Sequence, residues 1–364
     1  MKEFRGYLKG MGIGGWLTNV KRIKLLPAEM RKVITRGDLE HFERYITLED
    51  VKRIASFGVD HIRLAFDQIV IEDNDHPFTY RESGFQHVDR FIGWCKAEGL
   101  NVMLNLHKAV GAYCDCTDEG DLLKDSVLQD RFVKLWERLE TRYHRETTVA
   151  FEILNEVNSC DSENWNALAG RTVSMLRSLN PTRTIVIGSA LWNSVTKLKE
   201  LQVYNDANIA YTFHFYDPFE FTHQKSVIAT WNYLYNRDMP YPGDIEYYRD
   251  FQRFAKGNPA VYDAFERMDE TFIRSRLQPA ADWVKAHPDK ILYAGEFGTI
   301  RHCRPEWREN WMRDVIRFLK QHDIPYCVWN YLSTPYDCNR FSLVDDDRRE
   351  IVSLEMLRII QGRV

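Results

Sequence analysis

Ala150-Phe151-Glu152-Ile153-Leu154-Asn155-Glu156 is an apolar segment that ends on a carboxylate, and Ile291-Leu292-Tyr293-Ala294-Gly295-Glu296 repeats this pattern. A short apolar run with polar residues at its end is typical of a buried strand. In parallel α/β folds the functional groups lie on loops that follow the carboxyl ends of the strands. The two segments therefore predict a parallel α/β protein with two glutamates at one edge of its sheet.

The rest of the chain alternates β-rich runs with amphipathic helical stretches. Strands are expected at residues 9–13, 59–64, 100–106, 150–154, 183–187, 209–215, 291–294 and 325–329. Helices are expected between them, after the capping-box-like Thr47-Leu48-Glu49-Asp50 and at residues 85–98, 131–143, 164–179 and 273–285. This alternation predicts an α/β fold of the (β/α)8 TIM-barrel type, and residues 1–364 fit a single catalytic domain of this kind.

A glycine-rich segment near the N-terminus allows a competing interpretation. Gly10-Met11-Gly12-Ile13-Gly14-Gly15 is similar to the turn that binds dinucleotides in doubly wound sheets. However, its third glycine stands at the wrong spacing, and no helical stretch follows it at once. The barrel is therefore the better prediction, and no dinucleotide cofactor is expected.

One connection is too long for a plain loop. It separates the strand that ends near Phe215 from the helix at residues 273–285, and structureless loops of such length are uncommon in compact domains. Its aromatic residues are Phe219, Phe221, Trp231, Tyr233, Tyr235, Tyr241, Tyr247, Tyr248, Phe251 and Phe254. We expect an inserted small helical subdomain after strand six, at about residues 217–270, on the catalytic face. The alternative is a packing element without ligand contact.

Charge and hydropathy argue against several classes of partner. The chain has 49 basic and 53 acidic residues and a formal net charge of −4, which predicts neither nucleic acid nor a membrane as a partner. No apolar run approaches the roughly 20 residues of a membrane span. Because no apolar signal segment follows Met1, the sequence predicts a cytoplasmic protein, or a secreted one if a signal has been removed.

The cysteines favour free thiols in a reducing compartment. There are seven of them, an odd number, and their positions show no repeated spacing. Cys114-x-Cys116 lacks a second pair at zinc-finger spacing, so we expect an ordinary loop there rather than a metal site.

Polar or aromatic residues end several of the predicted strands. In chain order they are Arg63, His107, Asn155-Glu156, His214 with Tyr216, Glu296 and Trp329. Each residue alone has a structural explanation, such as an ion pair or core packing. Together they place charged, hydrogen-bonding and aromatic groups on one face of a barrel, which indicates an active site.

Glu152 competes with Glu156 as the functional carboxylate of its strand. Because side chains alternate along a strand, Glu152 points the same way as Glu156 but lies deeper in the barrel, by roughly 6–7 Å. We therefore expect Glu152 to be a buried structural carboxylate. Glu156, which directly follows Asn155, is expected to be the functional one.

This set of strand-end residues resembles the active-site pattern of glycoside hydrolase family 5, the cellulase family. Gly14-Gly15-Trp16 and the run from Phe213 to Phe219 are most similar to the single-domain bacterial endo-β-1,4-glucanases of that family. The resemblance covers essentially the whole chain. Two positions depart from it: Val157 replaces a common proline, and Ala109-Val110-Gly111 replaces Ala-Pro-Gly. Both changes alter loop stiffness, and thus substrate fit rather than reaction type.

The resemblance implies a role for each residue of the pattern. Glu296 is the expected nucleophile, and Arg63 and Tyr216 favour its ionised form. Glu156 is the expected acid/base, protonated in the free enzyme and oriented by His214. The residues expected to support the site or contact the substrate are Arg63, His107, Asn155, His214, Tyr216, Trp329, Trp16 and Trp192. No metal or organic cofactor is implied, and a monomer is expected.

The leading hypothesis is a retaining endo-β-1,4-glucanase that acts on a β-glucan polysaccharide or oligosaccharide. A β-mannanase or a mixed-linkage glucanase would use the same residues, and loops such as Trp192-Asn193 decide between them. A metal-dependent barrel hydrolase built on His107, His214 and the cysteines is a second class. A non-catalytic carbohydrate-binding barrel is a third. The balance of endo and exo action stays open at this point.

Overall fold

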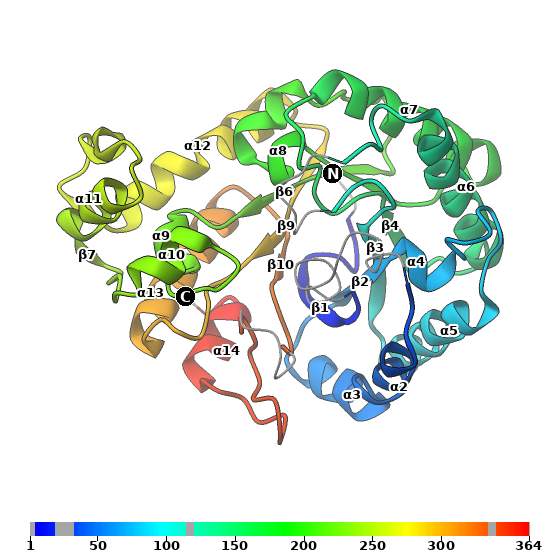
Figure 1. Ribbon diagram of the computed structural model, residues 1–364, viewed down its shortest axis with the longest axis horizontal. Helices are drawn as coiled ribbons and strands as arrows, with labels where there is room; N and C mark the ends of the chain where they lie inside the picture. Colours follow the sequence, from blue (N-terminus) through cyan, green and yellow to red (C-terminus); the bar gives the residue numbers. More distant parts are fainter. Residues whose placement is uncertain (1–3, 19–32, 114–119, 334–339, 364) are drawn as a thin grey trace.

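Parallel strands close into a barrel at the centre of the molecule (Figure 1). This computed structural model of the protein describes residues 4–18, 33–113, 120–333 and 340–363. The strands are β1 (Lys9–Leu17), β2 (His61–Asp67), β3 (Asn101–Lys108), β4 (Val149–Glu152), β5 (Ile185–Gly188), β6 (Ile209–Phe215), β9 (Ile291–Phe297) and β10 (Tyr326–Val328). Around the barrel their order is β1-β10-β9-β6-β5-β4-β3-β2. The predicted (β/α)8 barrel is confirmed, with a strand at each expected position.

Helices surround the barrel (Figure 1). The longer ones are α2 (Arg36–Arg44), α3 (Leu48–Ser56), α5 (Glu82–Ala97), α6 (Ser126–Tyr143), α7 (Ser162–Leu179), α12 (Glu270–Ala286), α13 (Pro305–Gln321) and α14 (Leu354–Ile360). Short ones are α4 (Gln68–Ile71), α8 (Ala190–Asn193) and η2 (Val195–Glu200). Local sequence sets the helix ends: Thr47 and Asp50 form a capping box before α3, and Gly99, with φ of 72°, follows α5. Within the described part of the chain, no helix has the length and apolarity to cross a membrane.

The interior of the barrel has an apolar layer and a polar layer. Near the amino ends of the strands lies an apolar cluster of Phe4, Tyr7, Met103, Ala150, Val186, Ala210, Ile291, Tyr293 and Cys327. The polar layer contains Arg63 on β2, together with Asn105, Glu152 and Glu296, which come later in strands that contribute to the apolar cluster. None of these four residues is more than 4% exposed. Polar groups therefore gather at the carboxyl ends of the strands, where barrel proteins build their functional sites.

The position of Glu296 depends on an irregularity between β6 and β9. The register of pairing shifts after Phe213, so that His214 pairs with Glu296 and Gly295 has no partner on β6. Strict alternation from the interior Tyr293 would turn Glu296 outward, whereas the shift brings it into the barrel. A Cβ atom at Gly295 would come within 2.5 Å of a β6 side chain, so this bulge requires glycine.

Between β6 and α12 the chain forms a projecting lobe, at the left of Figure 1. We call residues 216–269 the β6–α12 segment. Its elements are α9 (Phe219–Thr222), α10 (Thr230–Tyr235), β7 (Gly243–Asp244), α11 (Ile245–Phe254), η3 (Pro259–Tyr262) and β8 (Arg267–Met268). Its buried aromatic side chains include Tyr235, Tyr241, Tyr248, Phe251 and Tyr262. The sequence predicts helices alone here, and the structure adds the antiparallel pair β7–β8.

Candidate active site

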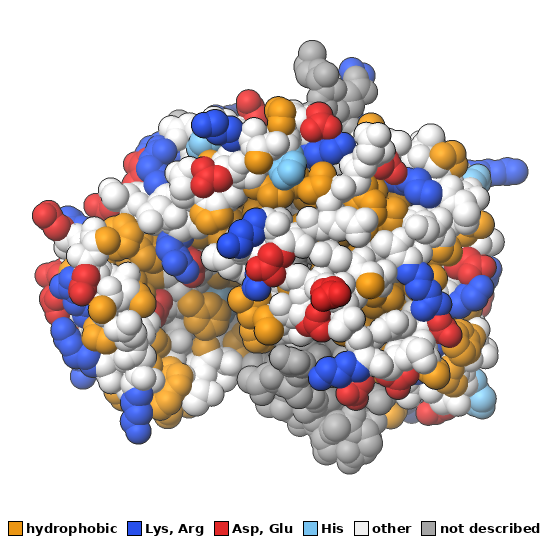
Figure 2. Space-filling model, turned by 90° about the horizontal axis from the view of Figure 1, so that it is seen from above, with side chains coloured by type: hydrophobic (Ala, Val, Ile, Leu, Met, Phe, Trp, Pro, Cys, Tyr) orange, Lys and Arg blue, Asp and Glu red, His pale blue; other side chains and the backbone are white. Residues whose placement is uncertain are grey.

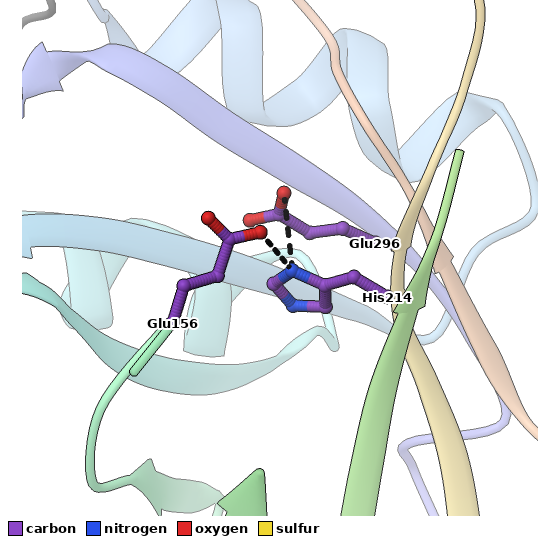
Figure 3. A group of neighbouring side chains, drawn as sticks. All are labelled: Glu156, His214 and Glu296. Atoms are coloured by element: carbon purple, nitrogen blue, oxygen red, sulfur yellow. Dashed lines mark hydrogen bonds and ion pairs between the residues drawn. The ribbon is translucent and has the colours of Figure 1, made fainter. Parts of the chain in front are cut away.

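Glu156, His214 and Glu296 meet at the carboxyl end of the barrel (Figure 3). His214 Nδ1 lies 2.7 Å from Glu156 Oε1 and 3.7 Å from Glu296 Oε2. One carboxylate oxygen of each glutamate and a ring nitrogen of His214 all lie within 4.8 Å of one another. The side chain of Glu156 is 16% exposed and that of Glu296 is 6% exposed. The two strand-end glutamates are therefore neighbours, with an imidazole beside both.

Arg63 on β2 connects the groups at the base of the site. Its Nε and Nη2 donate to the two oxygens of Glu152, at 2.6 and 2.8 Å. Its Nη1 donates to Glu296 Oε1 at 2.5 Å, and Nη2 also donates to Asn155 Oδ1 at 2.7 Å. Arg63 and Glu152 have no exposed side-chain surface. Glu152 is thus a buried carboxylate that holds the arginine in place, as side-chain alternation predicts.

The surroundings of Glu296 shift its pKa in opposing directions. Burial raises the pKa, His214 and Arg63 lower it, and the charge of Glu156 raises it, with a net rise above the ordinary value. The Tyr216 hydroxyl donates to Glu296 Oε2 at 3.0 Å, and a donor of this kind favours the carboxylate form. The site therefore contains a buried carboxyl group whose ionised form is stabilised by a cation and a hydroxyl.

His214 is neutral near neutral pH, because burial lowers its pKa to about 4. A neutral imidazole carries a proton on only one of its two nitrogens, and Nδ1 is the nitrogen that faces Glu156. His214 can therefore donate to that carboxyl group or accept from it without adding a positive charge. Burial, together with the charges of Lys108 and Arg63, also holds the pKa of His107 well below its ordinary value.

Trp329 and His107 form an aromatic pair within the site. Their rings are stacked, with centroids 5.5 Å apart and planes 10° apart. Asn105 Oδ1 lies 3.0 Å from His107 Nδ1 and orients the imidazole. Gly12 and Gly14 on β1 leave space for the indole, since Cβ atoms there would come within 2.8 and 2.4 Å of it. The half-buried Trp329 therefore presents a flat apolar surface in a fixed orientation.

Trp192 lies on the loop after β5, close to the chain that follows Glu156. Its backbone N–H donates to the Val157 carbonyl at 2.8 Å, and its side chain is 41% exposed. Leu191, Trp192 and Asn193 have φ values of 55–56°, a left-handed conformation that is uncommon outside glycine. The buried Asn193 side chain accepts from a backbone N–H of the same loop at 2.8 Å. This loop thus exposes an indole next to the chain that follows Glu156.

Trp16 does not line the site, and the prediction that it contacts substrate is wrong. Its side chain is fully buried, and its indole N–H donates to the Phe42 carbonyl on α2 at 2.8 Å. The cause is Gly15, whose φ of 73° coincides with a shift in the pairing of β1 with β2. Gly14 faces the indole of Trp329, but after this bulge Trp16 points outward to the helices.

Hydrogen bonds and ion pairs link six of the predicted residues into one cluster: Arg63, Asn155, Glu156, His214, Tyr216 and Glu296. His107 and Trp329 form the adjacent pair. The predicted site residues do not include Asn105, which orients His107, or Gly12, which makes room for Trp329. The sequence does contain a sign of both residues, because side chains two positions apart in a strand point to the same face. Asn105 stands two residues before His107, and Gly12 stands two residues before Gly14.

Within the residues that the structure describes, the ligands of the metal-dependent alternative are not brought together. Among the residues that the structure describes, the group with metal-ligand spacing is Glu156, His214 and Glu296. It includes neither His107 nor a cysteine. The predicted loop at Cys114-x-Cys116 lies outside the described residues.

We expect Arg63→Met to destabilise the fold as well as to impair the site. Without the guanidinium, Glu152 and Glu296 lose their buried cation, and breaking a buried ion pair in this way costs roughly 3–5 kcal/mol of unfolding free energy. Urea denaturation measures this loss. As a control, Arg63→Met combined with Glu152→Gln removes one unpaired carboxylate and should recover part of the stability but not the activity. Equal stability of Arg63→Met and the parent would contradict this role.

In glycosidases, the distance between the two catalytic carboxyl groups indicates the reaction mechanism. Retaining glycosidases place their two carboxyl groups about 5–5.5 Å apart, whereas inverting ones leave about 6.5–9.5 Å. One oxygen of Glu156 and one of Glu296 lie within 4.8 Å of each other, which agrees with the shorter spacing. Fold and site together define a (β/α)8 glycosidase of the retaining class.

The comparison with known families agrees with this class. The family model described as Cellulase (glycosyl hydrolase family 5) matches residues 27–334. The chain belongs to glycosyl hydrolase family 5. The family that the strand-end residues predict is therefore confirmed, and the protein is an endoglucanase-like glycoside hydrolase.

Relatives of known name match nearly the whole chain. Endoglucanase C of Acetivibrio thermocellus is 36% identical over 359 residues, which cover 97% of this chain and 98% of the relative. Cellodextrinase A of Ruminococcus flavefaciens is 27% identical over 327 residues, with 89% and 85% covered. The solved structure of Thermotoga maritima Cel5A with cellobiose has a TM-score of 0.73, 24% identity and 97% coverage of each chain. Its complex with mannotriose has the same TM-score and identity, with 98% coverage of each chain. The solved structures share the fold of this protein.

Proposed function

We propose that the protein is a retaining endo-β-1,4-glucanase that cleaves cellulose-type or mixed-linkage β-glucans. The observation that carries the proposal is the carboxylate pair of Glu156 and Glu296, with His214 within reach of both. The choice of a glucan is supported by the 36% identity with Endoglucanase C over nearly the full length of both proteins. A β-mannanase would use the same carboxylates, and the substrate test below separates the two.

Glu296 is the proposed nucleophile. One of its oxygens attacks the anomeric carbon and forms a glycosyl ester, while the bond from that carbon to the leaving oxygen breaks. Arg63 and Tyr216 contact its two oxygens at 2.5 and 3.0 Å and stabilise the negative charge before the attack. Because Glu152 holds Arg63 in turn, the attacking group is positioned before the substrate arrives.

Glu156 is the proposed acid/base. Its carboxyl group gives a proton to the leaving oxygen, and its carboxylate then takes a proton from the water that attacks the ester. That second attack returns Glu296 to its free form and releases a sugar with retained β configuration. His214 Nδ1, 2.7 Å from Glu156 Oε1, orients the carboxyl group in both steps.

The sugar at the cleavage point is proposed to lie against Trp329, whose orientation His107 and the β1 glycines fix. Apolar C–H faces of sugars pack on such flat aromatic surfaces. Asn155, oriented by its bond to Arg63, is proposed to hold the 2-hydroxyl. The exposed Trp192 is proposed to contact the leaving part of the chain. We further propose that residues 1–364 act as one domain and as a monomer.

We expect the acidic limb of the pH profile of kcat/KM to lie above the ordinary pKa of glutamate, about 4.3. Attack requires ionised Glu296, and burial raises the pKa of this group. The rate should therefore fall as the pH drops through that raised value. Tyr216→Phe removes a donor to the carboxylate and should move the limb upward by about one pH unit. Initial rates across the acidic and neutral range test this, and a shift to lower pH in the variant would contradict it.

The substrate proposal is tested by initial rates on carboxymethyl-cellulose, barley β-glucan, glucomannan, laminarin and cello-oligosaccharides, with analysis of product lengths. We expect internal cleavage of the β-glucans that contain 1,4 linkages, and NMR of the first product should show the β anomer. If glucomannan is cleaved faster than carboxymethyl-cellulose and barley β-glucan, the protein is a mannanase instead. An initial α anomer would exclude the ester route through Glu296.

A further inference from the structure

A cavity of about 470 Å³ lies between the β6–α12 segment and α12. Its volume falls in the range of about 300–1,000 Å³ that is typical of small-molecule sites. The residues that line it include Asp217, Phe219, Glu220, Trp231, Gln252 and Arg276. We propose that this cavity is a second carbohydrate site, which binds part of the β-glucan chain away from the catalytic glutamates. The chemical class of this ligand rests on the proposed function.

Two exposed aromatic rings line the cavity. Phe219 is 45% exposed and Trp231 is 44% exposed, although both belong to short helices with a buried side. The ring of Phe219 stacks on His223 with centroids 4.0 Å apart, and Trp231 packs edge-on against Phe254 at 6.0 Å. Their neighbours therefore fix the direction in which each ring faces. Oriented aromatic faces beside polar groups are suited to the C–H faces and hydroxyls of a sugar.

The polar groups of the cavity are held in place by one another. Arg276 Nε lies 2.9 Å from Asp217 Oδ2, and these side chains are 48% and 33% exposed. Glu220, only 7% exposed, accepts a hydrogen bond from the Tyr262 hydroxyl at 2.7 Å and another from the Gln252 amide. Because each charged group already has a partner, a neutral ligand with many hydroxyls suits the cavity better than an ion does.

The cavity lies beside the catalytic centre but does not include its glutamates. Asp217 directly follows Tyr216, which bonds to the proposed nucleophile Glu296. His223 stacks on Phe219 and also contacts the ring of Tyr216 edge-on, at 5.1 Å. Figure 2 shows hydrophobic side chains interspersed with charged ones on the left-hand part of the molecule, where Figure 1 places this lobe. A glucan chain bound here stays close to the catalytic glutamates, which raises its local concentration there.

Trp231→Ala separates binding at this cavity from catalysis, and Tyr233→Ala is the matched control. Tyr233 belongs to the same helix α10 and is 53% exposed, but it does not line the cavity. We expect Trp231→Ala to leave turnover of p-nitrophenyl β-cellobioside unchanged and to lower kcat/KM on barley β-glucan about twofold to tenfold, the worth of one aromatic contact. Tyr233→Ala should change neither rate. Thermal unfolding of each variant checks that the fold is intact.

Affinity electrophoresis in gels that contain barley β-glucan measures binding directly, with Glu296→Gln present in every variant to prevent hydrolysis. We expect the Glu296→Gln protein, with or without Tyr233→Ala, to be retarded more than the one that also carries Trp231→Ala. Arg276→Gln, which changes an exposed side chain of the same cavity, should reduce retardation in the same way. If Trp231→Ala and Arg276→Gln are retarded like the parent while the active parent hydrolyses β-glucan, the second site is refuted. If the active parent does not hydrolyse any β-glucan, the proposed function fails instead.

Discussion

Glu296→Gln should reduce kcat on β-glucan by roughly 10⁴- to 10⁶-fold, the range seen when an enzyme loses its nucleophile. The amide keeps the size of the side chain and an oxygen that can accept from Arg63, but it cannot form a stable glycosyl ester. Binding should therefore survive while turnover disappears. Initial rates and the binding of cello-oligosaccharides to the variant measure these two effects separately.

Glu152→Gln is the matched control for this experiment. Glu152 bonds to the same guanidinium as Glu296 but has no exposed surface through which to reach a sugar. If Glu296 acts by covalent attack, the Glu152 variant should lose far less activity than the Glu296 variant. Equal losses of activity in the two variants would mean that activity depends on the negative charge around Arg63 rather than on an attacking oxygen of Glu296. Ordinary activity of Glu296→Gln would refute the assignment outright.

Glu156→Ala should lower kcat on β-glucan by roughly 10²- to 10⁴-fold, the contribution of a positioned general acid and base. The loss should be much smaller for the first step on aryl cellobiosides, because a good leaving group needs little protonation. The second step lacks its base, so the glycosyl ester on Glu296 should accumulate. Mass spectrometry of the variant after mixing with such a substrate detects this ester.

Azide supplies the control for the two roles, since a small anion can enter the space that the deleted carboxylate leaves. With Glu156→Ala it should attack the ester and give a β-glycosyl azide, together with a faster reaction. With Glu296→Ala it should attack the substrate itself and give the α-glycosyl azide. The same anomer from both variants would contradict the assignment of one nucleophile and one acid/base.

Most of the cluster could be predicted because strand ends are readable in the sequence. The apolar runs that precede Arg63, His107, Glu156 and Glu296 mark buried strands, and the alternation with helices makes those strands parallel. Parallel strands in a barrel present their carboxyl ends on one face. The resemblance to family 5 then distinguished the two glutamates, which composition and spacing alone left equivalent.

The prediction that Trp16 contacts substrate is wrong because a glycine interrupts the alternation of side chains along its strand. Gly15, with φ of 73°, turns Trp16 away from the site and into contact with α2. Gly295 acts in the opposite sense, because the shift of register around it brings Glu296 into the barrel. A glycine within a strand is a known sign of a bulge, but the direction of the bulge depends on the neighbouring strand.

The sequence by itself determined the barrel, the family and the identity of the carboxylate pair, because hydrophobic periodicity and strand-end residues are local properties of the chain. Only the tertiary structure decided that Glu152 holds Arg63 beside that pair and how burial shifts the pKa of the neighbouring His214. Arg63 bonds to both Glu152 and Glu296, which lie 89 and 233 positions away along the chain. The neutrality of His214 likewise follows from burial among several strands. Such contacts depend on barrel closure and register, which no single segment specifies.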